Sequence, residues 1–249
     1  MKHAATVLGT LVASLAGTSH GAGPAAATCS AASPAAVVPV VELYTSEGCN
    51  SCPPADRWLS GLKAAPDVVA LAFHVDYWDR LGWKDRFASP AFTQRQASQQ
   101  ASTGARFSYT PQVIVDGLDR KDWPSLRVPS GSRAQASVAV TMVREGDQVV
   151  AKVLPSAGAP KRLAAYWAVT EQGHATAVKA GENDGGTLRH DYVVREYEAA
   201  PPWLGRAGAA ETLRFATASR ADPSHPRSVN LVVVDATTGR PVQALKLDC

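Results

Sequence analysis

The pentapeptide Cys49-Asn50-Ser51-Cys52-Pro53 most constrains the chain, because it places two thiols between an apolar run and a stretch with helical periodicity. The start of a helix offers unpaired N–H groups and the positive end of its dipole, which favour a thiolate at Cys49. The pattern therefore predicts a redox dithiol at a strand-to-helix turn. A CxxC pair is also half of a structural zinc site, but no second pair at zinc-like spacing occurs. An inert structural disulfide is the remaining alternative.

The first 27 residues have the pattern of a secretory signal. Residues 1–3 are basic, residues 4–16 are apolar and uncharged, and residues 17–27 are small and polar. The apolar stretch is too short for a membrane span, and no later run reaches the roughly 20 residues that a transmembrane helix needs. We therefore expect a periplasmic or secreted protein without a membrane span.

Two further cysteines, Cys29 and Cys249, lie near the predicted mature start and at the end of the chain. An oxidising compartment allows them to pair with each other, as a staple that leaves the dithiol chemically alone. Because connectivity does not follow from sequence, free or intermolecular thiols stay open as alternatives.

The composition favours packed globular structure and excludes several function classes. Hydrophobic residues make up 45% of the chain and charged residues 19%, with a net charge of +3. No basic run, aromatic-basic interleaving or glycine-rich phosphate loop occurs, so neither nucleic-acid nor nucleotide binding is expected. We expect no cofactor, and the sequence leaves the oligomeric state open.

Periodicity predicts alternating strands and helices in the first half of the chain. Residues 37–44, 68–75 and 113–115 are predicted strands, and the second of them is apolar enough to be covered on both faces. A helix is predicted after the CxxC pair, with Pro53 and Pro54 in its first turn and Asp56 on its polar side. A second helix is predicted over residues 90–103, between Pro90 and Gly104.

The pattern changes near residues 129–132, which we interpret as a domain boundary. Beyond it, short strands separated by turn signals predict an antiparallel β-sandwich. The predicted strands are 136–143, 148–154, 163–170, 190–197, 212–216 and 229–234. The expected fold class is therefore α/β, with one domain over residues 37–128 and a mostly antiparallel β-sandwich domain over residues 133–249.

Several longer motifs carry a family resemblance. Residues 41–56, 72–79 and 109–112, together with 181–190 and 193–195, resemble the DUF1223 family of secreted thioredoxin-like proteins. The resemblance implies a thioredoxin-like fold for the first domain and thiol–disulfide exchange with protein or peptide substrates. Cys49 would be the exposed nucleophile, and Cys52 would resolve the mixed disulfide. Pro111 would be a cis-proline facing the dithiol, and the Thr110 backbone would bind substrate.

Glu42 is a carboxylate in a strand that should be buried, where a raised pKa would suit proton transfer to the resolving thiol. The alternative is a Glu that reaches solvent or caps a neighbouring group. His74 is more simply a satisfied core histidine than a group near the dithiol. His190 is expected in a structural network rather than in a catalytic site, and the aromatic residues Tyr77, Trp78 and Trp83 in packing rather than in a peptide-binding wall.

These observations favour an exported thiol–disulfide oxidoreductase over two other classes. One is a copper-binding or metallochaperone module, in which Cys49, Cys52 and His74 would hold Cu(I). The other is a binding domain that uses the fold only as a scaffold. Asn50 and Ser51 supply no cation to the thiolate and Glu47 disfavours it, so we expect a reductant or isomerase rather than a strong oxidant.

Overall fold

The structure, a computed structural model, describes residues 1, 29–65, 67–128 and 133–248. The predicted signal segment, the predicted boundary at 129–132 and Cys249 lie outside the described residues, apart from Met1. The expected Cys29–Cys249 pairing therefore stays a prediction. Among the described residues, no helix is both long and apolar enough to cross a bilayer.

The described residues form many strands and only two α-helices, α1 (Pro53–Ser60) and α2 (Pro90–Thr103), with three short 3₁₀ segments. The strands are β1 (Ser30–Ala32), β2 (Val40–Thr45), β3 (Val69–His74), β4 (Gln112–Val115), β5 (Leu118–Asp119), β6 (Val138–Glu145), β7 (Gln148–Pro155), β8 (Arg162–Glu171), β9 (His174–Ala177), β10 (Thr187–His190), β11 (Val193–Leu204), β12 (Glu211–Ala216), β13 (Arg227–Asp235) and β14 (Pro241–Leu247).

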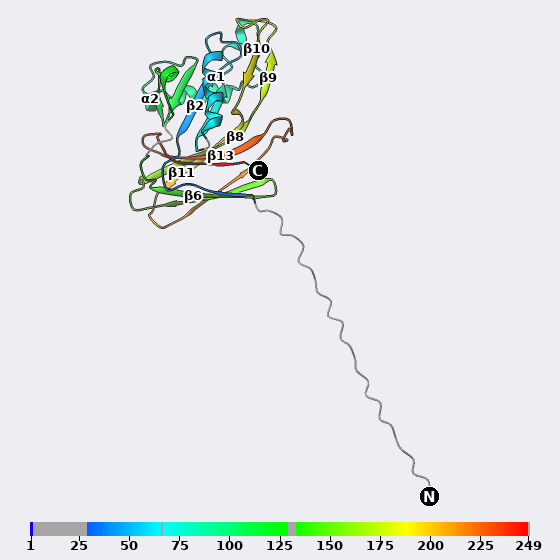
Figure 1. The fold of residues 1–249 in the computed structure, drawn as a ribbon. Coiled ribbons are helices and arrows are strands. Elements are labelled where there is room, and N and C mark those ends of the chain that lie inside the picture. Colours follow the sequence, from blue (N-terminus) through cyan, green and yellow to red (C-terminus); the bar gives the residue numbers. More distant parts are fainter. Residues whose placement is uncertain (2–28, 66, 129–132, 249) are drawn as a thin grey trace.

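One eight-stranded sheet runs through the molecule in the order β14-β13-β8-β11-β3-β2-β4-β5. Its only parallel pairs are β2–β3 and β3–β11, and every other neighbouring pair is antiparallel. A four-stranded sheet, β1-β6-β7-β12, is stacked on the β8–β13–β14 half, and β9 and β10 form a separate hairpin beside α1 (Figure 1).

The expected α/β fold class, with a thioredoxin-like domain followed by a sandwich, is wrong. The described chain is mostly β, with predominantly antiparallel sheets. The physical reason is long-range pairing, because β11 adds its start to the free edge of β3, with Val193 opposite Ala72, and β8, β13 and β14 extend the same sheet. Strand periodicity is local and does not report which strand becomes a neighbour.

The local elements themselves were largely predictable. Helix α2 begins at Pro90, is capped by the Ser89 hydroxyl and ends at Gly104, which adopts the left-handed conformation with φ 79°. Pro53 and Pro54 occupy the first turn of α1, as predicted. The expected strands match β2, β3, β4, β6, β7, β8, β11, β12 and β13 to within a few residues at most ends, whereas β11 runs on to residue 204.

Helices α1 and α2 cover opposite faces of β2 and β3. On the α1 side, Val41 and Leu43 pack with Ala55 and Leu59. On the α2 side, residues of the alternate set such as Tyr44 and Phe73 pack with Phe92 and with β8 and β13. Alternation along β2 therefore decides which side chains can reach the CxxC helix.

Glu42 belongs to the α2 side and forms a buried ion pair with Arg95. The Arg95 Nη2 to Glu42 Oε1 distance is 2.5 Å, and both side chains are 5% exposed. The Tyr166 hydroxyl donates to the same oxygen at 2.5 Å, and Arg95 also donates to Tyr44. This network ties β2 to α2 and to β8.

We predict that Glu42→Gln lowers the free energy of unfolding by about 3–5 kcal/mol, because it leaves the buried Arg95 charge without its partner. Urea unfolding measures the change, and adding Arg95→Met should recover part of it. The matched control is Asp122→Asn in the exposed Arg120–Asp122 pair, which should leave the free energy of unfolding nearly unchanged because solvent screens that pair. Equal costs for the two single variants would contradict a structural role of the buried pair.

Candidate functional site

Cys49 and Cys52 form a disulfide at the start of α1. Cys52 is the N-cap residue, and its carbonyl accepts the first helical hydrogen bonds, from Ala55 N at 2.9 Å and Asp56 N at 3.2 Å. The Ser51 hydroxyl lies 3.4 Å from Cys49 Sγ. The expected dithiol position at a strand-to-helix turn is thus confirmed.

The Thr110–Pro111 peptide bond is cis, as the resemblance implied. Trp78 connects this segment to the dithiol loop. Its indole N–H donates to Thr110 Oγ1 at 2.8 Å, and a β-carbon on Gly48 would lie only 3.0 Å from Trp78 Cβ. The Thr110–Pro111 segment and the dithiol loop therefore both contact Trp78. The roles of Pro111 and Thr110 toward a substrate stay predictions.

The dithiol is buried, and the expectation of an exposed Cys49 is wrong. Both cysteines are 0% exposed. The loop between β9 and β10 contacts the segment that carries them: the Asn183 amide donates to the carbonyls of Glu47 at 2.9 Å and Cys49 at 3.0 Å, and Asn50 N donates to Glu182 Oε2 at 3.1 Å. A segment from the second half of the chain therefore covers the dithiol loop.

Glu42 does not join this site. Its side chain lies on the α2 face of β2 with Arg95, whereas Thr45, on the other face, donates its hydroxyl to Asp56 of α1 at 3.0 Å. Because successive strand residues point to opposite faces, Glu42 is separated from α1 by the sheet. The structure supports the alternative of a Glu engaged with neighbouring groups, and it provides no contact for a proton relay to Cys52.

Five ionisable side chains are buried next to the dithiol loop: Glu47, Asp56, His74, Asp85 and His190. His74 Nδ1 lies 2.6 Å from Asp85 Oδ2, which also accepts from Glu47 N at 2.9 Å. His190 lies between two carboxylates, with Nε2 3.4 Å from Glu47 Oε1 and Nδ1 3.5 Å from Asp56 Oδ1. The rings of His74 and His190 are 4.9 Å apart between centroids.

The charges in this cluster are mutually stabilised. Burial lowers the pKa of His190, but its interactions with Asp56 and Glu47 outweigh that effect and raise it to about 9. For Asp85, burial acts to raise the pKa, but the charge and the hydrogen bond of His74 outweigh burial and lower the pKa to about 2. The pKa of Glu47 is also lowered, against the effect of burial, by interactions with His190 and with Trp83, whose indole N–H donates to Oε2 at 2.8 Å.

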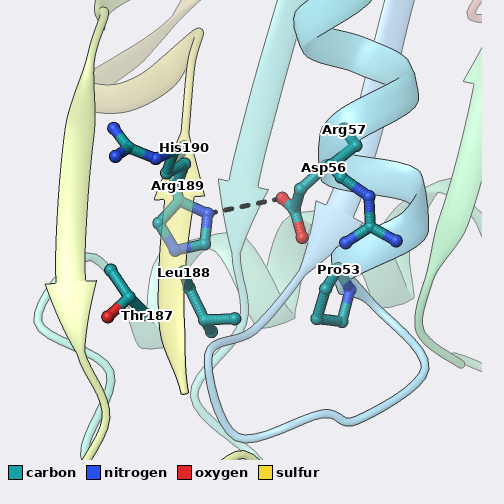
Figure 2. Close-up of a pocket in the computed structure, with 7 residues that line it drawn as sticks. All are labelled: Pro53, Asp56, Arg57, Thr187, Leu188, Arg189 and His190. Atoms are coloured by element: carbon teal, nitrogen blue, oxygen red, sulfur yellow. Dashed lines mark ion pairs between the residues drawn. The ribbon is translucent and has the colours of Figure 1, made fainter.

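A small pocket of about 130 Å³ opens onto the cluster between α1 and β10. Its lining residues are Pro53, Asp56, Arg57, Thr187, Leu188, Arg189 and His190. Figure 2 shows the carboxylate of Asp56 and the ring of His190 facing each other across it, joined by the ion pair. The cluster is therefore reachable from the surface beside the dithiol helix.

Sequence analysis singled out Glu47, His74 and His190 but did not bring them together, and it missed the burial of Asp56 and the role of Asp85. Asp56 was expected on the polar side of its helix but is 6% exposed, and Asp85 lies in a segment that showed no regular pattern. His74 faces the α1 side of β3, so it lies near the dithiol loop rather than in a purely apolar core. The available signal was the position of Glu47 and Asp56, on either side of the CxxC pair.

Comparisons with known proteins place the chain in a family. The chain belongs to DUF1223, a family described as proteins of unknown function, whose model matches residues 40–234. The crystal structure of protein AGR_C_4864 from Agrobacterium tumefaciens is similar, with a TM-score of 0.60 and 27% identity over 85% of this chain and 94% of that one. HBP35 of Porphyromonas gingivalis shares the fold, with a TM-score of 0.61 and 15% identity over 87% of this chain and 76% of that one. A comparison with curated proteins finds no significant match.

We predict that Asn183→Ala speeds reduction of the Cys49–Cys52 disulfide by dithiothreitol. The substitution removes two hydrogen bonds that hold the covering loop, and a net loss of about 1.4 kcal/mol makes the open state about tenfold more populated. The control is Asp184→Ala, at an exposed neighbour in the same loop. Equal reduction rates in the two variants would show that Asn183 does not control access.

Proposed function

We propose that the protein is an exported thiol–disulfide oxidoreductase that acts on protein disulfides through Cys49 and Cys52. The observation that carries the proposal is the disulfide between these residues at the N-terminus of α1, linked by Trp78 to Thr110–Pro111. The positive end of the helix dipole favours a thiolate, which is the reactive form in exchange. Export is proposed from the signal pattern of the first 27 residues.

The exchange needs no cofactor. In the reducing direction, the Cys49 thiolate attacks a substrate disulfide, forming a mixed disulfide and releasing one substrate thiolate, which takes up a proton. The Cys52 thiol then loses its proton and attacks the Cys49 sulfur. This step forms the Cys49–Cys52 disulfide and releases the second substrate thiol, so two electrons pass to the substrate. The oxidising direction is the reverse.

Burial of the dithiol gives this chemistry an access requirement. Glu182 and Asn183 hold the backbone at Cys49 and Asn50, and we infer that a protein substrate reaches Cys49 when this loop moves away. A backbone strand of the substrate would then occupy the space vacated by this loop, with the Thr110 backbone as its hydrogen-bonding partner. This favours extended, locally unfolded substrates over compact ones.

The electrostatics next to the dithiol favour a reductant or isomerase. Asn50 and Ser51 carry no positive charge, and Glu47, two residues before Cys49, is held in its charged form. Negative charge close to a thiol raises its pKa and destabilises the thiolate. A strong oxidant needs a stabilised thiolate in its reduced state, so this environment favours a reductant or isomerase. The Cu(I) alternative would need both cysteines as thiolates, so it applies only to the reduced protein.

We predict that Cys52→Ala accumulates mixed disulfides with substrate proteins through Cys49, because the resolving thiol is missing. Non-reducing electrophoresis of the exported fraction detects the adducts, and mass spectrometry identifies the partners. The double variant Cys49→Ala/Cys52→Ala is the matched control and should trap nothing.

The direction is tested separately, on the native pair in glutathione buffers. A reductant requires a potential well below that of DsbA, so a value near about −120 mV would contradict this part of the proposal. Absence of any adduct in Cys52→Ala would instead favour the scaffold alternative.

A further inference from the structure

The buried cluster beside the dithiol has a second property that thiol exchange does not use. Asp56 on α1, His74 at the end of β3 and His190 at the end of β10 each offer one ligand atom, and these three atoms lie within 4.8 Å of one another. Two imidazoles and a carboxylate from three separate elements converge on one point. All three residues are buried.

Two of the three side chains are oriented by a hydrogen bond to a second group through their other polar atom. His74 uses Nδ1 for Asp85, at 2.6 Å, and Asp56 uses Oδ2 for the Thr45 hydroxyl, at 3.0 Å. Metal-binding histidines characteristically direct their second ring nitrogen at a carboxylate, which fixes the ring and raises its basicity. The supporting shell of a metal site is therefore present.

Three ring nitrogens of the two histidines have no hydrogen-bond partner among the residues that the structure describes. His74 Nε2 and both ring nitrogens of His190 are buried and make no hydrogen bond within the described part of the chain. His74 is 0% exposed and His190 2% exposed. The His190 nitrogens face only carboxylate oxygens, at 3.4 and 3.5 Å, and His74 Nε2 has no hydrogen-bond partner among the described residues. These nitrogens therefore keep their capacity to bind a ligand.

The distance between His190 and Asp56 matches two ligands of one metal ion better than a hydrogen bond. His190 Nδ1 and Asp56 Oδ1 are 3.5 Å apart, beyond an ordinary charge-assisted hydrogen bond of about 2.7–2.9 Å. Two ligands that bind one Zn²⁺ at about 2.0–2.1 Å in tetrahedral geometry lie about 3.3 Å apart. With Nδ1 on the metal, His190 Nε2 faces Glu47 Oε1 at 3.4 Å, which forms a second histidine–carboxylate pair.

We propose that Asp56, His74 and His190 bind one Zn²⁺ ion, through Asp56 Oδ1, His74 Nε2 and His190 Nδ1. Imidazole and carboxylate ligands without a thiolate suit Zn²⁺ better than Cu(I), and the two imidazoles disfavour Mg²⁺ and Ca²⁺. Three protein ligands leave a fourth position open, and the pocket between α1 and β10 gives a path to it (Figure 2). This site does not depend on the proposed thiol chemistry.

The test is a Zn²⁺ titration of tag-free, chelator-treated protein with its disulfide intact, followed by calorimetry and by metal analysis after desalting. We expect one equivalent of retained Zn²⁺ and a rise in the melting temperature, because the ion joins α1, β3 and β10. Co²⁺ in place of Zn²⁺ should give a visible spectrum of nitrogen and oxygen ligands without thiolate charge-transfer bands. Failure of the folded protein to retain Zn²⁺ overturns the proposal.

Four variants assign the ligands. His74→Ala and His190→Gln should abolish stoichiometric binding, and Asp85→Asn, which touches no metal, should weaken it about 10–100-fold. His225→Ala is the matched control, since His225 stacks on His174 outside the cluster, and it should bind Zn²⁺ as the native protein does. Circular dichroism verifies the fold of each variant. Unchanged binding in folded His74→Ala or His190→Gln overturns the assignment.

The cysteines separate this proposal from the thiol function. Cys49→Ser/Cys52→Ser should lose every thiol-exchange reaction and keep its one equivalent of Zn²⁺. Loss of Zn²⁺ in this folded variant would overturn the three-residue site in favour of a cysteine-bound metal. Retained Zn²⁺ in a protein whose dithiol traps no substrate would leave the metal site standing and remove the oxidoreductase proposal.

Discussion

Strand β3 has a parallel neighbour on each edge, β2 on one side and β11 on the other, and the position of the site depends on this double pairing. The β11 contact is short: Val193 lies opposite Ala72, and Ala72 N donates to Tyr192 O at 2.8 Å. Because β10 ends shortly before β11 begins, the register fixes His190 beside the end of β3, where His74 lies. One long-range pairing thus brings the second half of the chain onto the dithiol helix.

Sequence reasoning succeeded where the determinants are local. Pro90 and Gly104 mark the ends of α2, and Cys52 with the two prolines after it marks the start of α1. It failed where partners are distant in sequence. A buried acid before the CxxC pair predicts a role for Glu42 near the dithiol. Only the positions of α1 and α2 on opposite faces of β2 show that Glu42 points away from α1. The fold class failed for the same reason, since no local pattern reports that β11 joins β3.

The family-like segment around residues 181–190 shows that sequence similarity can mark residues of the site without revealing their contacts. Sequence similarity marked Glu182, Asn183 and His190 without indicating what they contact. In the structure, the first two contact the dithiol loop and the third lies between Glu47 and Asp56. A hairpin that both contacts the dithiol loop and supplies a cluster residue links the position of that loop to the arrangement of the cluster. Motion of β10 away from α1 would disturb both at once.

The two buried charge networks of this protein differ in a way that bears on their roles. Around Glu42, Oε1 accepts hydrogen bonds from Arg95 and Tyr166 at 2.5 Å and Oε2 a longer one from Gln99 at 3.5 Å, and Arg95 Nε is left without a partner among the described residues. Around His190, Glu47 Oε1, His74 Nε2 and the His190 nitrogens have none among the described residues. A buried ion pair repays its desolvation only with good geometry and satisfied polar atoms. The contacts of His190 are longer than good hydrogen bonds, at 3.4 and 3.5 Å, and apolar side chains in the same space would pack at lower cost. A cation that draws these atoms together supplies the missing interactions, which is why the cluster is better explained as a binding site than as part of the core.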